Sequence, residues 1–287
     1  MEADQIERVR DFNRYYTGRL GLLADTYLGQ DRPLGQARLL FEIGDGCDLR
    51  DLRARLALDS GYLSRLLRAL EDQGLVTVDV HPSDGRVRVA RLTDAGHQER
   101  AELDARSRER IAGLLHGLTH DQRDQLIAAQ NQVRRLLRLS TVSIEHVAAA
   151  AEPARDCLRR YAAELDDRFP EGYDAASLTP PAEMTGEQLL AYEDGRPAGC
   201  GLWTHLETDV AEIRHLWIAP EARGLGLGRL LLQHLEDGAS ADGVTTVRLG
   251  THTALTEAIS LYRRSGYHEI ANYSASPYNQ LAFEKHL

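Results

Sequence analysis

The sequence is short of lysine and of cysteine, and each shortage excludes a kind of site. Lys285 is the only lysine in the 287 residues. A phosphate-binding loop of the Walker type needs a lysine followed by Ser or Thr, so that loop is excluded. The three cysteines, Cys47, Cys157 and Cys200, are odd in number and far apart in the sequence, which suits neither a disulfide framework nor a metal site. We therefore expect no bound metal.

Long apolar runs are missing as well. No run approaches the roughly 18 residues that a membrane-spanning helix needs, and residues 1–12 are charged, without the apolar core of a signal peptide. With 43% hydrophobic and 27% charged residues the composition is that of a globular protein, and the length allows two domains. We expect a cytoplasmic protein that has no membrane partner.

The acidic excess lies entirely in the second half of the chain. Residues 1–140 hold 22 basic and 22 acidic side chains, whereas residues 141–287 hold 12 and 22. An acidic domain favours cationic amine ligands over nucleic acid, while a neutral domain can still bind DNA if its arginines gather on one face. The two halves therefore suit different partners.

A glycine-rich stretch, Arg223–Leu232, follows an apolar run at residues 213–218 that predicts a strand. Gly224, Gly226 and Gly228 place no side chains in the turn, so consecutive backbone N–H groups can converge on one ligand. The leucines that follow have helical spacing, and a helix N-terminus favours phosphate. The stretch therefore predicts a pyrophosphate site.

Two other interpretations of this stretch remain. A dinucleotide-binding turn needs G-x-G-x-x-G, whereas these glycines are spaced G-x-G-x-G, and no repeated βαβ units precede them. The stretch could also be a simple connection that binds no ligand. Three glycines before a helix would then cost conformational entropy on folding without serving a function.

The stretch resembles motif A of the GNAT family of acetyltransferases, R/Q-x-x-G-x-G/A. Arg223, Gly226 and Gly228 match that motif position by position. Residues 211–220 resemble the central strand of the family, and residues 257–267 resemble its last helix and turn. The resemblance implies a GNAT acyltransferase fold, which is an α/β domain with a mixed, mostly antiparallel sheet, and acetyl-CoA as the cosubstrate.

The resemblance also implies where the coenzyme lies. Backbone groups of Trp217 and Ile218 would hold the pantetheine arm as an added strand would. One departure is Leu255, which stands where many relatives have an asparagine that contacts the coenzyme. The expected coenzyme-binding residues are Trp217, Ile218, Arg223, Gly224, Leu225, Gly226, Leu227, Gly228 and Arg229.

Acetyl transfer to an amine needs a base and an acid. A lysine-like amine has a pKa of about 10, so a base must remove a proton before attack, and the leaving thiolate needs a proton. Glu212, at the acidic position of the family's central strand, is the candidate base, and Tyr262, which the family places beside the coenzyme sulfur, is the candidate acid. Alternatively, Glu212 only orients the acceptor or pairs with an arginine, and Tyr262 is a core residue packed with Leu261 and Tyr267. His215 is a second candidate base, and three residues along a strand it should face the other side.

The remaining elements of the second half lead up to the central strand, which we expect from Val210. One of these elements is an irregular loop over residues 170–187, and in many acetyltransferases of this type the equivalent region covers the acceptor site. The pattern predicts a strand over residues 142–147, a helix over 153–169, that loop over 170–187, and a hairpin of 188–193 with 198–207 around Asp194-Gly195.

The first half predicts helices followed by a hairpin, which is the order of a mainly α winged helix-turn-helix domain. In the fourth helix the leucines make a buried face, and Ser64, Arg65 and Arg68 lie opposite them on a small, basic face. An Asp84-Gly85 turn joins the two hairpin runs. The predicted helices cover residues 6–27, 34–43, 48–56 and 59–74, the buried leucines are Leu63, Leu66, Leu67 and Leu70, and the hairpin runs are 76–80 and 86–92.

These residues resemble the MarR family of transcriptional regulators in Leu63-Ser64-Arg65, in Asp84-Gly85-Arg86 and in Leu92–Gly96. The resemblance implies that Ser64, Arg65 and Arg68 enter a major groove of double-stranded DNA. Arg86 would reach a neighbouring minor groove, with Asp84 holding that arginine in place. The alternative for Arg68 is a solvated surface residue.

Two long helical patterns over residues 97–139, broken at 117–121, carry more leucines than a small winged domain needs to cover. The MarR resemblance implies that they form a homodimer with the first helix, so the operator should be pseudo-palindromic. The alternative is a helical linker with no role in dimerisation.

The sequence thus predicts a MarR-like DNA-binding and dimerisation domain over residues 1–140 and a GNAT acetyltransferase domain over residues 141–287. We expect a transcriptional regulator that also transfers acetyl directly from acetyl-CoA to an amine acceptor, small molecule or protein. Two alternatives stay open: a regulator whose GNAT domain only senses acetyl-CoA, and an acetyltransferase whose winged helix serves only dimerisation.

Overall fold

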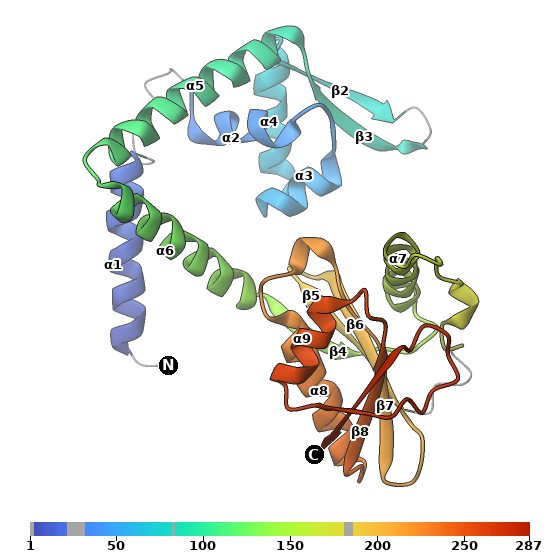
Figure 1. Ribbon diagram of the computed structural model, residues 1–287. Coiled ribbons are helices and arrows are strands. Elements are labelled where there is room, and N and C mark those ends of the chain that lie inside the picture. The colour runs from blue at the N-terminus through green and yellow to red at the C-terminus, as the bar shows by residue number, and fades with distance from the viewer. Residues whose placement is uncertain (1–2, 22–31, 82–83, 181–185) are drawn as a thin grey trace. The chain divides into compact units, whose positions relative to one another are not determined.

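The computed structural model describes residues 3–21, 32–81, 84–180 and 186–287 (Figure 1). The chain divides into two compact units, Met1–Asp124 and Gln125–Leu287. Helix α6 (His120–Leu139) runs across that division, and the domain boundary predicted after residue 140 stays a prediction. Within the described ranges, none of the helices is both long and apolar enough to cross a membrane.

The first unit has one core, where helices α2 to α4 pack with a small sheet of order β1-β3-β2. The predicted apolar face of α4 is confirmed, since all four of its leucines are buried. Asp59 caps this helix, because its side chain accepts a hydrogen bond from the Tyr62 backbone N–H at 2.8 Å. The elements are α1 (Ala3–Leu20), α2 (Leu34–Ile43), β1 (Cys47–Asp48), α3 (Leu49–Leu56), α4 (Ser60–Asp72), β2 (Val76–His81), β3 (Asp84–Leu92) and α5 (Asp94–His116).

The predicted hairpin is present, but the predicted position of its turn is wrong. Asp84 and Gly85 lie inside β3, and Asp84 pairs with His81. Pairing from Val76 with Leu92 to Val80 with Arg88 fixes the register, and an irregularity after Val80 lets β3 continue back to Asp84. Asp84 and Gly85 therefore belong to the second strand of the hairpin.

Some of the predicted features lie outside the described residues. The first helix is confirmed over residues 3–20, but its predicted extension to residue 27 falls in the undescribed range 22–31. The side chains of Asp84 and Arg86 are also outside the description, so their predicted roles at DNA stay predictions.

The second unit is a seven-stranded sheet of order β4-β5-β6-β7-β8-β10-β9. Neighbouring strands are antiparallel except for β7 and β8, so the predicted mixed, mostly antiparallel sheet is confirmed. The elements are β4 (Val142–His146), α7 (Glu152–Arg168), a short 3-10 turn (Ala175–Ser177), β5 (Gln188–Glu193), β6 (Arg196–His205), β7 (Val210–Ile218), a second 3-10 turn (Pro220–Ala222), α8 (Leu227–Ala241), β8 (Thr246–Thr251), α9 (Thr256–Arg264), β9 (His268–Ile270) and β10 (Leu281–His286).

Helices cover both faces of this sheet (Figure 1). Leu231 and Leu235 of α8 pack in one core with Ile213 of β7, and Tyr262 of α9 joins the same core. A separate core places α7 against β6 and β7, where Cys157 of α7 lies with Trp217 of β7. Each face of β7 thus has its own helix.

Gly96 is a test of the packing in the first unit. A Cβ atom at Gly96 would lie 2.0 Å from the backbone oxygen of Leu75, whereas a Cβ at Gly113, on the same helix α5, would meet nothing within 4 Å. We expect Gly96→Ala to destabilise the unit by about 1–3 kcal/mol through overpacking.

The matched control, Gly113→Ala, should be neutral or stabilising by up to about 1 kcal/mol, because alanine is the better helix former. Hydrogen exchange of the β2 amides measures both effects. Equal protection in the two variants would contradict the close packing of Gly96 on Leu75.

Candidate functional site

The glycine-rich turn leads directly into helix α8. Gly224 and Gly226 have positive φ values of 77° and 94°, which glycine adopts without strain, and Gly226 is the N-cap of α8. Gly228 lies in the first turn of the helix rather than in the turn before it, because the helix begins at Leu227. That part of the prediction is wrong.

The N-terminus of α8 has the features of an anion-binding site. In the described part of the chain, none of the backbone N–H groups of residues 224–229 donates a hydrogen bond to another protein group. The first turn of α8 also contains no acidic residue and no capping side chain. Unsatisfied N–H groups at a helix N-terminus favour phosphate.

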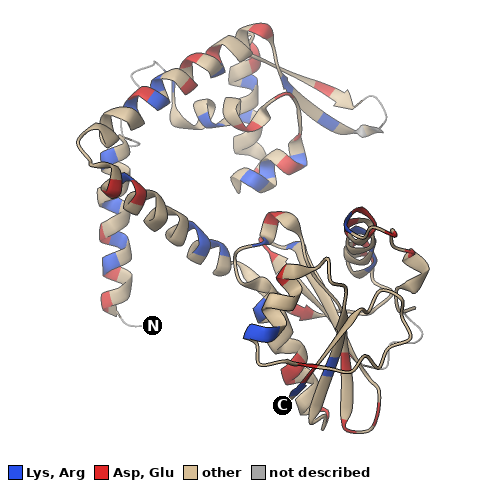
Figure 2. Ribbon diagram, viewed as in Figure 1, with Lys and Arg blue, Asp and Glu red and all other residues tan. Residues whose placement is uncertain are grey.

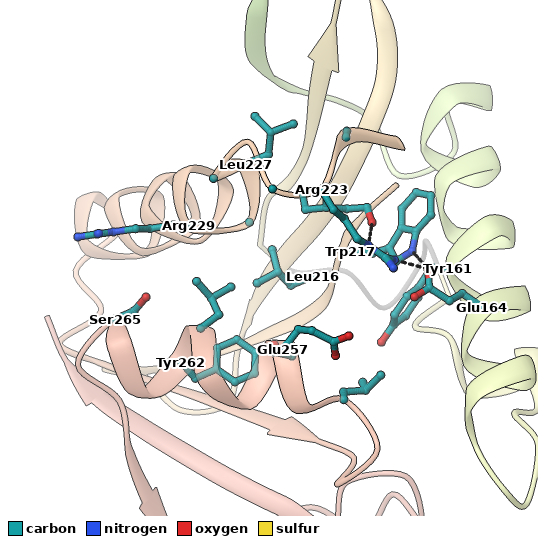
Figure 3. A pocket seen from close by; sticks show the side chains of 18 of the residues that line it. Tyr161, Glu164, Leu216, Trp217, Arg223, Leu227, Arg229, Glu257, Tyr262 and Ser265 are labelled. Carbon is teal, nitrogen blue, oxygen red and sulfur yellow. Dashed lines mark hydrogen bonds and ion pairs between the residues drawn. The ribbon is translucent and has the colours of Figure 1, made fainter. Parts of the chain in front are cut away.

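A cavity of about 550 Å³ opens beside this turn (Figure 3). Tyr161 and Glu164 reach it from α7, and Glu257 and Tyr262 reach it from α9. Its volume lies in the range of small-molecule and cofactor sites. Of the residues predicted to bind the coenzyme, it is lined by Trp217, Ile218, Arg223, Gly224, Gly226, Leu227, Gly228 and Arg229.

Leu225 differs from its neighbours in the predicted set. Its side chain is buried with Ala198 and Ala222, and it does not line the 550 Å³ cavity. The predicted contact of Leu225 with the coenzyme therefore concerns only its backbone N–H group.

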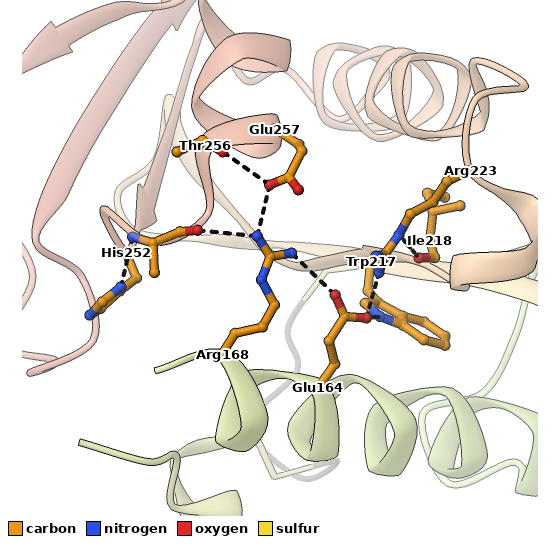
Figure 4. Close-up of polar contacts among 9 residues, drawn as sticks. Glu164, Arg168, Trp217, Ile218, Arg223, His252, Thr256 and Glu257 are labelled. Atoms are coloured by element: carbon orange, nitrogen blue, oxygen red, sulfur yellow. Dashed lines mark hydrogen bonds and ion pairs between the residues drawn. The ribbon is translucent and has the colours of Figure 1, made fainter. Parts of the chain in front are cut away.

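Arg223 points along the wall of the cavity and joins two elements (Figure 4). Its Nε donates to the Ile218 carbonyl oxygen at 3.0 Å, and its Nη2 contacts the carboxylate of Glu164. Glu164 also accepts from the Trp217 indole N–H at 2.8 Å and from Arg168 at 3.2 Å. The arginine of the motif thus fixes the loop to α7 and β7.

Glu164 is the centre of this network. Burial raises the pKa of its carboxyl group, but hydrogen bonds from Trp217 and Arg223 lower that pKa more, so Glu164 stays ionised. Arg168 extends the network to α9, because its Nη2 donates to Glu257 at 2.8 Å. Three elements around the cavity are therefore held by one chain of ion pairs.

Strands β7 and β8 separate beside the 550 Å³ cavity. Strand β7 pairs with β8 only from Val210 to Glu212, and in the described chain its edge on that side has no strand partner after Glu212. Backbone groups there can hold an extended ligand as an added strand would. The predicted place of the pantetheine arm, at Trp217 and Ile218, lies on this unpaired part.

A β-bulge interrupts β7 at the same place. The register with β6 shifts between Leu202 paired with Arg214 and Cys200 paired with Trp217, and His215 has a φ of 54°. Ile213 before the bulge and Leu216 after it both pack in the α8 core, so the side-chain alternation changes by one residue. This change decides which side chains share a cavity.

His215 consequently lies on the same side as Glu212, and the prediction that it faces the opposite side is wrong. Both side chains line a second cavity of about 80 Å³, and the His215 ring lies 5.7 Å from that of Tyr161 on α7. Burial lowers the pKa of His215 to about 3, and its Nε2 accepts a hydrogen bond from the Thr179 N–H at 3.0 Å. The imidazole is therefore neutral, and the acceptor nitrogen is already used.

The two cavities adjoin each other. Glu212 lines only the smaller one, whereas Tyr262 lines both. The other residues that line both cavities are Tyr161, Leu165, Leu216, Leu255 and Ala258. Glu212 and Tyr262, whose catalytic roles stay predictions, thus both line the smaller cavity.

Glu212 is buried at the edge of the paired part of β7, with an exposed fraction of 7%. Its Oε1 accepts from the Tyr273 hydroxyl at 2.9 Å, and its Oε2 lies 3.3 Å from the Arg214 Nε. Both contacts stabilise a carboxylate without involving every lone pair.

The Tyr262 hydroxyl group lies in a buried environment. Burial raises the pKa of Tyr262 above its ordinary value of 10, so the phenol is protonated at neutral pH. Its ring packs against Tyr267 and Phe283 at 6.0 Å, and no hydrogen bond of its hydroxyl is found among the described residues. Tyr262 therefore packs in the core and also lines both cavities.

The first unit presents the predicted DNA-contacting face of α4. Ser64, Arg65 and Arg68 are exposed, on the side opposite the buried leucines. Arg65 lies over the Tyr62 ring at 5.7 Å, and the Ser64 hydroxyl donates to the Ser60 carbonyl oxygen at 2.8 Å. A helix with one buried and one small, basic face is the geometry of a recognition helix.

Sequence patterns did not point to several residues of the site. Glu164 and Arg168 belong to a helix predicted only by its apolar positions. Tyr273, by contrast, lies in the tail over residues 273–278, which the sequence predicted to contact the acceptor. Arg135, on α6, also lines the larger cavity. The one available signal was the spacing of Glu164 and Arg168, which puts them on one face of a helix.

The fold and the site thus define a winged helix-turn-helix unit followed by an acyltransferase unit. The model of a family described as Acetyltransferase (GNAT) family matches residues 150–267, and that of the MarR family matches residues 30–87. Over its second half the chain belongs to the GNAT acetyltransferase family, and its first half is similar to the MarR family.

Curated relatives match parts of the chain. The IAA acetyltransferase of Azospirillum brasilense is 31% identical over 125 residues, 42% of this chain and 82% of that protein. The Uncharacterized HTH-type transcriptional regulator YdgJ of Bacillus subtilis is 31% identical over 106 residues, 35% of this chain and 64% of that protein. The [Ribosomal protein bS18]-alanine N-acetyltransferase of Escherichia coli is 32% identical over 91 residues, 31% of this chain and 61% of that protein.

His215 predicts a pH dependence of stability. Its folded pKa lies below the ordinary 6.5, so as pH falls from 6.5 towards 3 the unfolded chain binds a proton that the folded chain does not. The free energy of unfolding should therefore fall with pH by up to about 1.4 kcal/mol per pH unit. His215→Gln should show a shallower fall.

Urea unfolding followed by tryptophan fluorescence reports on this unit, since both Trp203 and Trp217 lie in it. His234→Gln, at an exposed histidine of α8, is the matched control and should keep the wild-type slope. Parallel curves for His215→Gln and the wild type would contradict the buried, neutral state of His215.

Proposed function

We propose that the protein is a DNA-binding transcriptional regulator that also acts as an N-acetyltransferase, using acetyl-CoA and an amine acceptor. The observation that carries the catalytic part is the meeting of Glu212 and Tyr262 in a cavity that adjoins the glycine-turn cavity. A protein that only sensed the coenzyme would need the larger cavity but no carboxylate and phenol beside it.

The chemistry of direct transfer fits these groups. Acetyl-CoA, when bound, supplies an acetyl thioester. Glu212 accepts a proton from the ammonium group of the acceptor, directly or through a water, so that the nitrogen can form a bond to the carbonyl carbon. The carbon–sulfur bond then breaks, and the Tyr262 phenol gives its proton to the departing thiolate. As the amide forms, the nitrogen loses its second proton to the Tyr262 phenolate, which restores the phenol. Backbone N–H groups of β7 beyond Glu212 polarise the carbonyl.

The smaller cavity is the proposed acceptor site. It is lined by Glu212 and by aromatic side chains, among them Tyr173 and Tyr278, whose rings lie 4.7 Å apart. Burial raises the pKa of Tyr173 to about 12, so this wall is uncharged. Arg214 also lines this cavity and pairs with Oε2 of Glu212, and the carboxylate lone pairs that remain beside the aromatic rings favour a cationic amine.

Dimerisation is proposed from an apolar stripe on α1. Ile6, Val9, Phe12 and Tyr16 are exposed at helical spacing, and no residue of α1 is buried. A second copy of the chain would cover this stripe, and two copies would present two recognition helices to one pseudo-palindromic DNA site.

Tyr262→Phe tests the proposed acid. Phenylalanine keeps the ring packing and removes the proton, so kcat should fall about 100-fold while the KM for acetyl-CoA stays near the wild-type value. The assay is release of free thiol from acetyl-CoA with a panel of primary amines. Tyr192→Phe, at a half-buried tyrosine of β5, is the matched control and should leave the rate unchanged.

Glu212→Gln tests the proposed base in the same assay. The rate should fall at neutral pH and recover as the pH approaches the pKa of the acceptor amine, because the free amine then forms in solution. A Glu212→Gln rate equal to the wild type at neutral pH, or no turnover by the wild type with any amine, would sink the catalytic proposal.

The double variant Arg65→Ala, Arg68→Ala tests the recognition helix. DNA affinity should fall about 10- to 100-fold for an operator selected by the wild-type protein from random duplexes, because charged contacts to bases and phosphates are lost. Arg196→Ala, at an exposed arginine of β6, is the control. Electrophoretic mobility shift measures the change, and unaltered binding would exclude these arginines from the DNA contact.

A further inference from the structure

A third cavity, of about 310 Å³, lies between α6 and the glycine-rich turn. It shares Arg135, Arg223 and Gly224 with the larger cavity, so the two adjoin each other. The residues that α6 contributes are Ala128, Asn131, Gln132, Arg134, Arg135 and Arg138. Figure 2 shows how the basic residues gather in the last turns of this helix.

Two of the arginines around this cavity are already paired. Arg138 forms an ion pair with Glu193 and donates to the Glu221 carbonyl oxygen at 2.9 Å. Arg223 is bound to Glu164 and Ile218, as described above. Each of these side chains holds protein elements together and has little capacity left for a ligand.

Arg135 is held differently. Its Nε donates to the Leu225 carbonyl oxygen at 3.3 Å, which places the guanidinium over the turn, and a Cβ atom at Gly226 would lie 3.4 Å from its Nη2. Within the described ranges, Arg135 has no carboxylate partner. A cation without a counter-ion, fixed beside unused N–H donors, is suited to a phosphate.

Coenzyme A has phosphate at two places. Its pyrophosphate is the group proposed for the N–H groups of residues 224–229, and a separate phosphate lies on the 3′ position of the ribose, beyond the pyrophosphate as seen from the thiol. Tyr262, the residue proposed to protonate the thiolate, lines the two cavities described above and does not line this third one, which adjoins the glycine-rich turn at Arg223 and Gly224.

We propose that Arg135, assisted by its neighbour Arg134, binds the 3′-phosphate of coenzyme A. The inference rests on the proposed binding of the coenzyme at the glycine-rich turn. It adds that the helix leading out of the first unit supplies part of the coenzyme site. The site would then discriminate between coenzyme A and its 3′-dephosphorylated form.

Calorimetric titration of the full chain with coenzyme A and with 3′-dephospho-coenzyme A tests this proposal. The wild type should bind coenzyme A roughly tenfold more tightly, the difference expected for one charge-assisted pair. Arg135→Gln should lose this preference by weakening the binding of coenzyme A alone. A distorted turn would instead weaken the binding of both ligands equally, which would overturn the proposal.

Arg155→Gln is the matched control, because it removes the same charge from an exposed position of α7 that lines neither cavity. It should keep the wild-type preference. Equal affinities of the wild type for both ligands, or an Arg135→Gln preference equal to that of the wild type, would overturn the inference and leave the proposed function standing. Binding of neither ligand by the wild type would overturn both.

Discussion

Strand β7 leaves its neighbour β8 after Glu212, and the site depends on that separation. While the strands are paired, the backbone groups of β7 are satisfied within the sheet and no ligand can reach them. Once they part, one edge of β7 is available as a template for an extended ligand. The bulge at His215 shifts the side-chain alternation of β7 by one residue. Glu212, His215 and Trp217 therefore lie on the same face of the strand. Neither feature requires an unusual residue, only a change in pairing.

An open sheet needs support, and the charge network around Glu164 supplies it. A strand edge without a partner would let α7 and α9 move relative to β7. The carboxylate of Glu164 ties Trp217 and Arg223 to α7, and Arg168 ties α7 to Glu257 on α9. Because the side chains of Glu164 and Arg168 are mostly buried, their attraction is less screened than that of a surface ion pair, whereas Glu257 is exposed. The arginine of the glycine-rich motif therefore supports the walls of the cavity, and the backbone N–H groups beside it are left for an anion.

Much of the fold followed from local patterns in the sequence. The helix over residues 34–43 and the leucine face of α4 were predicted correctly, because helical periodicity and capping are local properties. The Asp194-Gly195 turn was predicted for the same reason, and both residues have the positive φ values that such a turn requires. The Asp84-Gly85 turn was misplaced because the register of β2 with β3, a property of two strands, overrode the local signal.

The sequence by itself determined the resemblance to two families, the glycine-rich turn, and the choice of Glu212 and Tyr262 as candidates, because each is carried by residues close together in the chain. Only the tertiary structure decided which side chains meet. It placed His215 beside Glu212 through a bulge, joined Arg223 to Glu164, and set Arg135 over the turn. Contacts between residues 59 to 90 positions apart, such as the last two, arise from packing of whole helices on a sheet. No local pattern records that packing.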